Sequence, residues 1–201
     1  MSDAMRIDDY EDYAENRRYT YADYLEWEGP ERCQLINGEV FMMASPSVAH
    51  QALSGELFNQ FYNWLRGKPC QVFAAPLDVR LFPKKDKSDN TVVQPDLLVV
   101  CDKDKLSKGS VDGAPDLVVE IVSPSNSPSE VFLKFHYYMK AGVREYWVID
   151  PEEKKVLVHI YENGHYISTA YEDSDHIPVT VLPGLEIALE DLWARIPANG
   201  G

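Results

Sequence analysis

The chain has 201 residues, of which 45% are hydrophobic and 11% aromatic, and its formal net charge is −14. This length and apolar content predict a globular protein with one sizeable core and exclude an intrinsically disordered chain. No run of about 18 apolar residues occurs, so we expect no membrane span. The acidic excess opposes non-specific binding to nucleic acid, although half of it lies in residues 1–31, where ten acidic side chains face three arginines.

The ends of the chain and its cysteines suggest a cellular location. Residues 1–6 lack an apolar core, so we expect no secretory signal there. Cys33, Cys70 and Cys101 are widely spaced and odd in number, so we predict neither a disulfide framework nor a zinc ribbon and expect a reducing compartment, the cytoplasm. We expect a flexible acidic lead-in over 1–18, one domain over 19–196 and a tail over 197–201.

The first half of the domain predicts two helices, a hairpin and three strands. Thr20 is a suitable N-cap for a short helix through Trp27, and Asn37-Gly38 predicts a type I′ turn in a hairpin over 34–43. Apolar residues at helical spacing predict a helix over about 48–66. Strands are expected near 70–82, 91–101 and 116–122, and the last two are too apolar to be exposed on one face.

The second half continues with alternating elements. Ser127, Pro128 and Glu130 form the sequence of a capping box, and Gly142 suits the left-handed residue that ends the same helix. We expect a strand over 143–150, a hairpin around Asn163-Gly164, a strand near 177–182 and a short helix near 189–195. Because no repeat or linker divides the chain, we predict one α/β domain with a mixed sheet.

Two carboxylates occur in apolar strands. Glu120 lies in the middle of the apolar run 115–124, and Asp96 lies near the start of the preceding one. Burial of a lone carboxylate costs several kcal/mol or more unless a cation, a proton or hydrogen bonds compensate for it. Two carboxylates on neighbouring strands, with the backbone carbonyl of Ile121 as a third oxygen, therefore indicate a magnesium site. Asp116 is a poorer partner, because four residues of strand separate it from Glu120 by about 13 Å.

A lysine beside such a site would orient or deprotonate the attacking water and stabilise charge on the phosphate. Position 122 is a valine, so the nearest candidate is Lys134 in the following helix. Lys134 falls on the border of that helix's apolar face, roughly 100° from its centre. Two interpretations stay open, a functional lysine and a structural ion pair with Glu120.

Several motifs, in this order and spacing, resemble the Uma2-like family, a group of unknown function regarded as restriction endonucleases. The likeness extends from about Tyr19 to Ile196. The segments that carry it are Leu35-Ile36-Asn37-Gly38-Glu39, Pro46-Ser47 with His50, Gln94-Pro95-Asp96, residues 115–125, Lys134 with Tyr138, Ala141-Gly142-Val143 and residues 145–151.

The family in turn resembles the PD-(D/E)XK nucleases, which cut phosphodiesters with a divalent metal. The resemblance implies a restriction-endonuclease-like mixed sheet flanked by helices, with peripheral β-hairpins. It makes Asp96 and Glu120 the metal carboxylates and Lys134 the motif lysine moved onto a helix, with Glu39 and His50 in the same pocket. The implied cofactor is Mg²⁺, with Mn²⁺ as a substitute, and the implied substrate is DNA. Because nucleases that cut both strands often pair two active sites, a homodimer is a further expectation.

Two other functions compete with an endonuclease. The acidic charge favours a catalytically inactive module that uses the same fold to bind nucleic acid or protein. The 12 tyrosines and 4 tryptophans would also suit a structural, self-associating domain.

Overall fold

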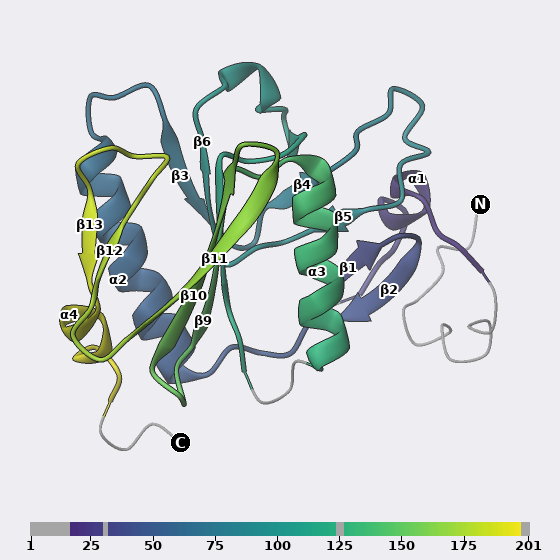
Figure 1. The fold of residues 1–201 in the computed structure, drawn as a ribbon. Coiled ribbons are helices and arrows are strands. Elements are labelled where there is room, and N and C mark those ends of the chain that lie inside the picture. Colours follow the sequence, from purple (N-terminus) through teal and green to yellow (C-terminus); the bar gives the residue numbers. More distant parts are fainter. Residues whose placement is uncertain (1–16, 30–31, 124–126, 198–201) are drawn as a thin grey trace.

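The computed structural model describes residues 17–29, 32–123 and 127–197 (Figure 1). Most of the expected lead-in, residues 1–16, and all but residue 197 of the expected tail lie outside the described residues. Arg17 and Arg18 are described, and they form ion pairs with Asp23 and Glu39. No helix in the described ranges is both long and apolar enough to cross a membrane.

A six-stranded mixed sheet forms the centre of the fold, in the order β11-β10-β9-β8-β6-β3. Its β8 and β9 are parallel, and its other neighbouring pairs are antiparallel. Helix α2 (Val48–Leu65) lies on one side of this sheet and α3 (Pro128–Ala141) on the other (Figure 1). The strands are β3 (Gln71–Ala74), β6 (Leu97–Val100), β8 (Leu117–Ile121), β9 (Glu145–Asp150), β10 (Lys155–Glu162) and β11 (His165–Glu172).

Side chains of the central strands alternate between two hydrophobic clusters, as the twofold period of a strand requires. Leu117, Val119 and Ile121 of β8 pack in the cluster that contains the buried face of α2. Val118 packs in the opposite cluster with Tyr138 of α3. The alternation therefore directs Glu120 to the α3 side, as an exception in an otherwise apolar strand.

A five-stranded sheet, in the order β2-β1-β5-β4-β7, lies beside the central one. Each long strand predicted over 70–82 and 91–101 is in fact divided between the two sheets, because Pro76 and Pro95 lack the N–H that a continuous ladder needs. Asp96 consequently lies at the corner where the chain passes between sheets. The strands are β1 (Cys33–Ile36), β2 (Glu39–Met42), β4 (Asp78–Arg80), β5 (Val92–Val93) and β7 (Ser110–Asp112), the last of which was not predicted.

Local signals at turns and helix ends are confirmed. Asn37 and Gly38 have φ values of 53° and 80°, as the predicted type I′ turn requires. Ser127 accepts a hydrogen bond from the N–H of Glu130, which is one of the two bonds of the predicted capping box, and Gly142 ends α3 with φ of 87°. Thr20 caps α1 (Tyr21–Tyr24), although this helix is shorter than predicted.

The C-terminal elements differ slightly from the prediction. The strand expected near 177–182 ends earlier, as β12 (His176–Pro178), and pairs with β13 (Glu186–Ala188). Helix α4 (Leu189–Trp193) follows directly and contributes buried side chains to the α2 cluster. A short 3-10 helix, η2 (Lys103–Lys105), follows β6.

The cysteine prediction is wrong, because a disulfide joins Cys70 to Cys101. Gln71 pairs with Val100 where β3 meets β6, so continuing the register by one residue brings the two cysteines face to face. A separation of 31 residues concealed this neighbourhood, which only strand pairing creates. Cys33 is free and buried.

Candidate active site

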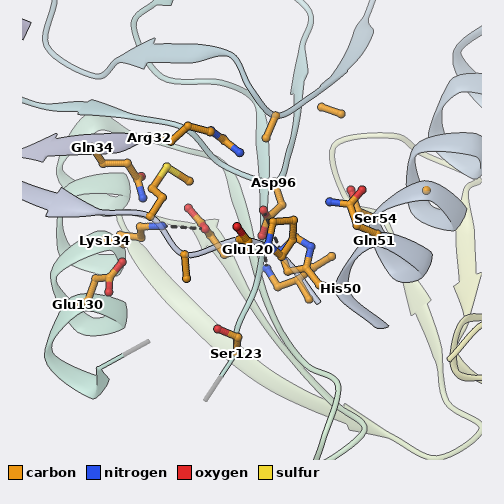
Figure 2. A pocket seen from close by; sticks show the side chains of 18 of the residues that line it. Arg32, Gln34, His50, Gln51, Ser54, Asp96, Glu120, Ser123, Glu130 and Lys134 are labelled. Carbon is orange, nitrogen blue, oxygen red and sulfur yellow. Dashed lines mark hydrogen bonds and ion pairs between the residues drawn. The ribbon is translucent and has the colours of Figure 1, made fainter. Parts of the chain in front are cut away.

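Strand register brings the two predicted carboxylates together. Leu97 of β6 pairs with Val119 of β8, so continuing the antiparallel register by one residue places Asp96 opposite Glu120. Directly opposed residues have their Cβ atoms about 5 Å apart and share one face of the sheet. Glu120 and Asp96 both line a pocket of about 640 Å³ (Figure 2).

Glu120 is held at both carboxylate oxygens by α3. The Lys134 Nζ donates to its Oε2 at 2.9 Å, and the Tyr138 hydroxyl donates to its Oε1 at 2.6 Å. Burial raises the pKa of Glu120 and the charge of Asp96 raises it further, while the Lys134 ammonium opposes both effects. Burial also raises the pKa of Tyr138 well above its usual value, so the tyrosine remains a neutral donor.

Lys134 does not extend to solvent, although its position on the border of the apolar face would permit this. Its side chain is only 8% exposed. Lys134 and Tyr138 are four residues apart, so they project from the same side of α3 toward Glu120. The ion pair between Lys134 and Glu120 is compatible with both interpretations left open by the sequence, a functional lysine and a structural ion pair.

Asp96 is fixed by two further contacts. Its Oδ1 lies 3.1 Å from the Nε2 of His50, and its Oδ2 accepts a hydrogen bond of 2.7 Å from the N–H of Ile121. His50 lies in the first turn of α2, where Ser47 accepts from its backbone N–H. The Nδ1 of His50 is buried without a hydrogen-bond partner among the described residues.

Ile121 contributes through its backbone. In a strand, the N–H and C=O of one residue point to the same side. Because the N–H of Ile121 donates to Asp96, its carbonyl also faces the Asp96 side of β8. The structure therefore brings Asp96, Glu120, Ile121, Lys134 and His50 to one pocket.

Glu39 and Asp116 lie elsewhere. Glu39 is not among the residues that line the pocket, and its exposed carboxylate contacts Arg18 instead. Asp116 lies at the opposite end of β8 from Glu120, where it accepts from the N–H of Cys101 and pairs with Arg144. Its distance from the pocket agrees with its rejection as a metal partner.

Several polar residues of this pocket were not predicted from the sequence, among them Arg32 and Gln34, and neither was Tyr138, which supports Glu120. Arg32 lies directly before β1 and Gln34 lies within it, in a segment without any motif that indicates a site. Tyr138 donates a hydrogen bond to Glu120 from α3. Its spacing of four from Lys134 would have placed it on the lysine's face, so helical periodicity could have identified it.

The donor set suits a hard divalent cation. Two carboxylates converge with a backbone carbonyl on the same side, and all three are oxygen donors. Within the described ranges, no cluster of three or more His, Cys, Asp or Glu side chains is arranged to enclose a metal. Magnesium does not need such a cage, because it usually retains several waters and binds only one or two carboxylates.

Comparison with known proteins places this geometry in a family. A family model described as "Uma2: Putative restriction endonuclease" matches residues 21–190. The uncharacterized protein slr1290 of Synechocystis is 25% identical over 175 residues, which cover 85% of this chain and 89% of that protein. A crystal structure described as "a putative nuclease belonging to DUF820" from Anabaena variabilis has the same fold, with a TM-score of 0.72 at 21% identity over 89% of this chain and 99% of that one. The chain, whose Asp96 and Glu120 line one pocket, thus belongs to the Uma2 family.

Proposed function

We propose that the protein is a divalent-metal-dependent endonuclease that hydrolyses phosphodiester bonds of DNA in this pocket. One observation supports the proposal above all. Asp96 and Glu120 come from adjacent antiparallel strands and converge with Lys134 in a single pocket, on a chain of a restriction-endonuclease family.

Asp96, Glu120 and the carbonyl of Ile121 would hold Mg²⁺, or Mn²⁺ in its place. When bound, such a cation supplies Lewis-acid polarisation of the scissile phosphate and lowers the pKa of a water nucleophile. The protein's part is to keep two mutually repelling carboxylates at one place. Tyr138 fixes Glu120, and His50 together with the Ile121 N–H fixes Asp96.

Lys134 would orient the attacking water and stabilise the charge that develops on the phosphate. Its ammonium is already positioned 2.9 Å from Glu120 and needs no large movement to face a substrate in the pocket. His50 would act beside Asp96 at the opposite wall, contacting the substrate phosphate or a base. Glu39 has no part in this proposal, because it lies outside the pocket lining.

A catalytically inactive module that binds nucleic acid or protein is the second candidate. One observation favours it, namely that each oxygen of both carboxylates already has a partner within the protein. These partners are His50 and the Ile121 N–H for Asp96, and Lys134 and Tyr138 for Glu120. A structural polar cluster would have the same contacts and would bind no cation.

Metal titration and DNA cleavage separate the candidates. Asp96→Asn and Glu120→Gln should each abolish calorimetric binding of Mg²⁺ or Mn²⁺ and metal-dependent cleavage of duplex DNA. Asp116→Asn is the matched control, since it removes a carboxylate that directly precedes β8 and lies outside the pocket, and it should leave both activities intact.

A folded wild-type protein that binds no divalent cation would exclude the metal-dependent mechanism. Binding of DNA without cleavage, unaffected by Asp96→Asn, would support the inactive module. Running RNA and single-stranded DNA in parallel tests the substrate class. Sedimentation of the free protein and of its DNA complex tests whether the protein is a homodimer, as the sequence resemblance leads us to expect.

A further inference from the structure

We infer that Arg32 is the phosphate-binding residue of the pocket, held ready by Gln94. The class of ligand, a phosphate group of a nucleic acid strand, rests on the proposed function. The inference itself comes from the charges and hydrogen bonds around the guanidinium.

Arg32 immediately precedes β1 and is half-buried. It lines the same pocket as Asp96, Glu120 and Lys134. Figure 2 shows its side chain extending from the β1 side toward Asp96, with its nitrogens at the pocket end. The guanidinium thus faces the space that a substrate of the two carboxylates would occupy.

A neutral amide orients this guanidinium. The Nε and Nη2 of Arg32 both donate to the Oε1 of Gln94, at 3.1 and 2.7 Å. Gln94 is itself fixed, because its Nε2 donates to the Tyr24 hydroxyl and to Asp78, at 3.1 and 2.9 Å. Its backbone N–H donates to the side chain of Gln34 at 3.1 Å. Arg32 is therefore pre-organised without being neutralised.

The charge pattern of the pocket distinguishes Arg32 from the other cations. Lys134 is paired with Glu120, and His50 contacts Asp96. Among the residues that the structure describes, no carboxylate oxygen lies within 4.0 Å of the Arg32 guanidinium. Five other arginines each have a carboxylate within that distance. Those five are Arg17, Arg18, Arg80, Arg144 and Arg195.

A half-buried cation without a counter-charge is unfavourable unless an anion joins it. This is notable in a chain with a net charge of −14, where acidic side chains are plentiful. A guanidinium has five N–H donors, of which the contacts to Gln94 use two. The remaining donors suit two oxygens of a phosphate, which arginine binds in a fork geometry.

The first test uses inorganic phosphate and needs neither metal nor cleavage. In a ¹⁵N-labelled protein, the side-chain Nε–H signal of Arg32 is assigned by its loss in Arg32→Gln. Adding phosphate should shift this signal in a saturable manner. The Nε–H signal of Arg66 is the internal control, because Arg66 is exposed and lies beyond Phe58, the last residue of α2 that lines the pocket.

The second test measures binding of a DNA duplex without divalent metal, by fluorescence anisotropy across a range of salt concentrations. Arg32→Gln should weaken binding roughly ten- to hundredfold, as expected for a charge-assisted contact. It should also reduce the salt slope by about 0.9, the value for one phosphate contact. Arg32→Lys should recover the slope but only part of the affinity, because lysine keeps the charge but loses the fork. Arg66→Gln should change both quantities little.

The outcomes separate this inference from the proposed function. If phosphate shifts Arg32 but the protein neither binds metal nor cuts DNA, the anion site stands and the nuclease proposal fails. If the protein cuts DNA while Arg32 ignores phosphate and Arg32→Gln keeps the wild-type salt slope, the inference is overturned. Equal losses in Arg32→Gln and Arg66→Gln would also overturn it, since net charge alone would explain them.

A duplex with and without 5′-phosphates distinguishes the source of the phosphate. Equal losses of affinity on both duplexes would assign Arg32 to an internal phosphodiester. A loss confined to the 5′-phosphorylated duplex would assign it to a strand end. Either pattern supports a phosphate contact at Arg32.

Discussion

Lys134→Met probes the buried ion pair at the centre of the pocket. Methionine keeps an unbranched side chain and favours helix, but it removes the ammonium that lies 2.9 Å from Glu120. Glu120 is then left only 7% exposed, opposite Asp96, with the Tyr138 hydroxyl as its remaining side-chain partner. The variant therefore creates an uncompensated charge in the core.

Breaking a buried pair by removing one partner destabilises a protein by about 3–5 kcal/mol. A domain has only about 5–15 kcal/mol of stability, so the effect should be large. Glu120 can escape part of it by taking up a proton, because burial already raises its pKa and the loss of Lys134 removes the opposing effect. A raised folded-state pKa favours the folded protein at low pH, so the deficit should grow as the pH rises through that pKa.

Urea denaturation of the wild type, Lys134→Met, Glu120→Gln and the double variant measures these effects. The double variant should be destabilised by less than the sum of the two single ones, because removing both charges leaves none uncompensated. Adding Mg²⁺ at about 100 times its dissociation constant should return about 2.7 kcal/mol to Lys134→Met. It should return nothing to Glu120→Gln, which lacks the second carboxylate.

A Lys134→Met variant that stays within about 1 kcal/mol of the wild type at pH 8 would show that the pair is not a buried one, since an exposed pair loses no more than this. If the destabilisations of the two single variants add up to that of the double variant, the two side chains do not interact. If the Lys134 and Glu120 substitutions are strongly coupled but Mg²⁺ does not stabilise Lys134→Met, the ion pair is supported and the metal site is contradicted.

Three further perturbations test other parts of the structure. Tyr138→Phe removes a hydroxyl that donates to a buried carboxylate at 2.6 Å, and it should lower the free energy of unfolding in urea by about 1.5–3 kcal/mol. Tyr146→Phe is the control and should lower it little, because the Tyr146 hydroxyl has no hydrogen-bond partner among the described residues. Burial lowers the pKa of His159, so the unfolded chain binds a proton at this histidine more readily than the folded protein does. The free energy of unfolding should therefore fall as the pH drops below about 6.5. His159→Gln should lose this pH dependence, and a variant with the wild-type pH profile would contradict the prediction. Reducing the disulfide between Cys70 and Cys101, which are 31 residues apart, should lower the free energy of unfolding by about 3–4 kcal/mol. Equal melting temperatures of the oxidised protein and of a variant with serine at both positions would contradict this prediction.

Local sequence determined much of the fold because its signals act over a few residues. The Asn37-Gly38 turn, the Ser127 cap and the left-handed Gly142 each depend on backbone preferences that neighbours cannot easily override. The strands predicted near 70–82 and 91–101 were too long, because each range contains a proline that lacks the N–H of a continuous ladder. In the structure, Pro76 and Pro95 mark the points where the chain changes sheets.

The sequence alone also identified the two carboxylates, since a charge in an apolar strand needs an explanation wherever it occurs. Only tertiary structure decided what surrounds them. Register places Asp96 opposite Glu120, α3 turns Lys134 inward, and Gln94 presents Arg32 while Glu39 is left outside the pocket. These contacts join residues up to 62 positions apart, so they depend on how sheets and helices pack and not on any local preference of the chain.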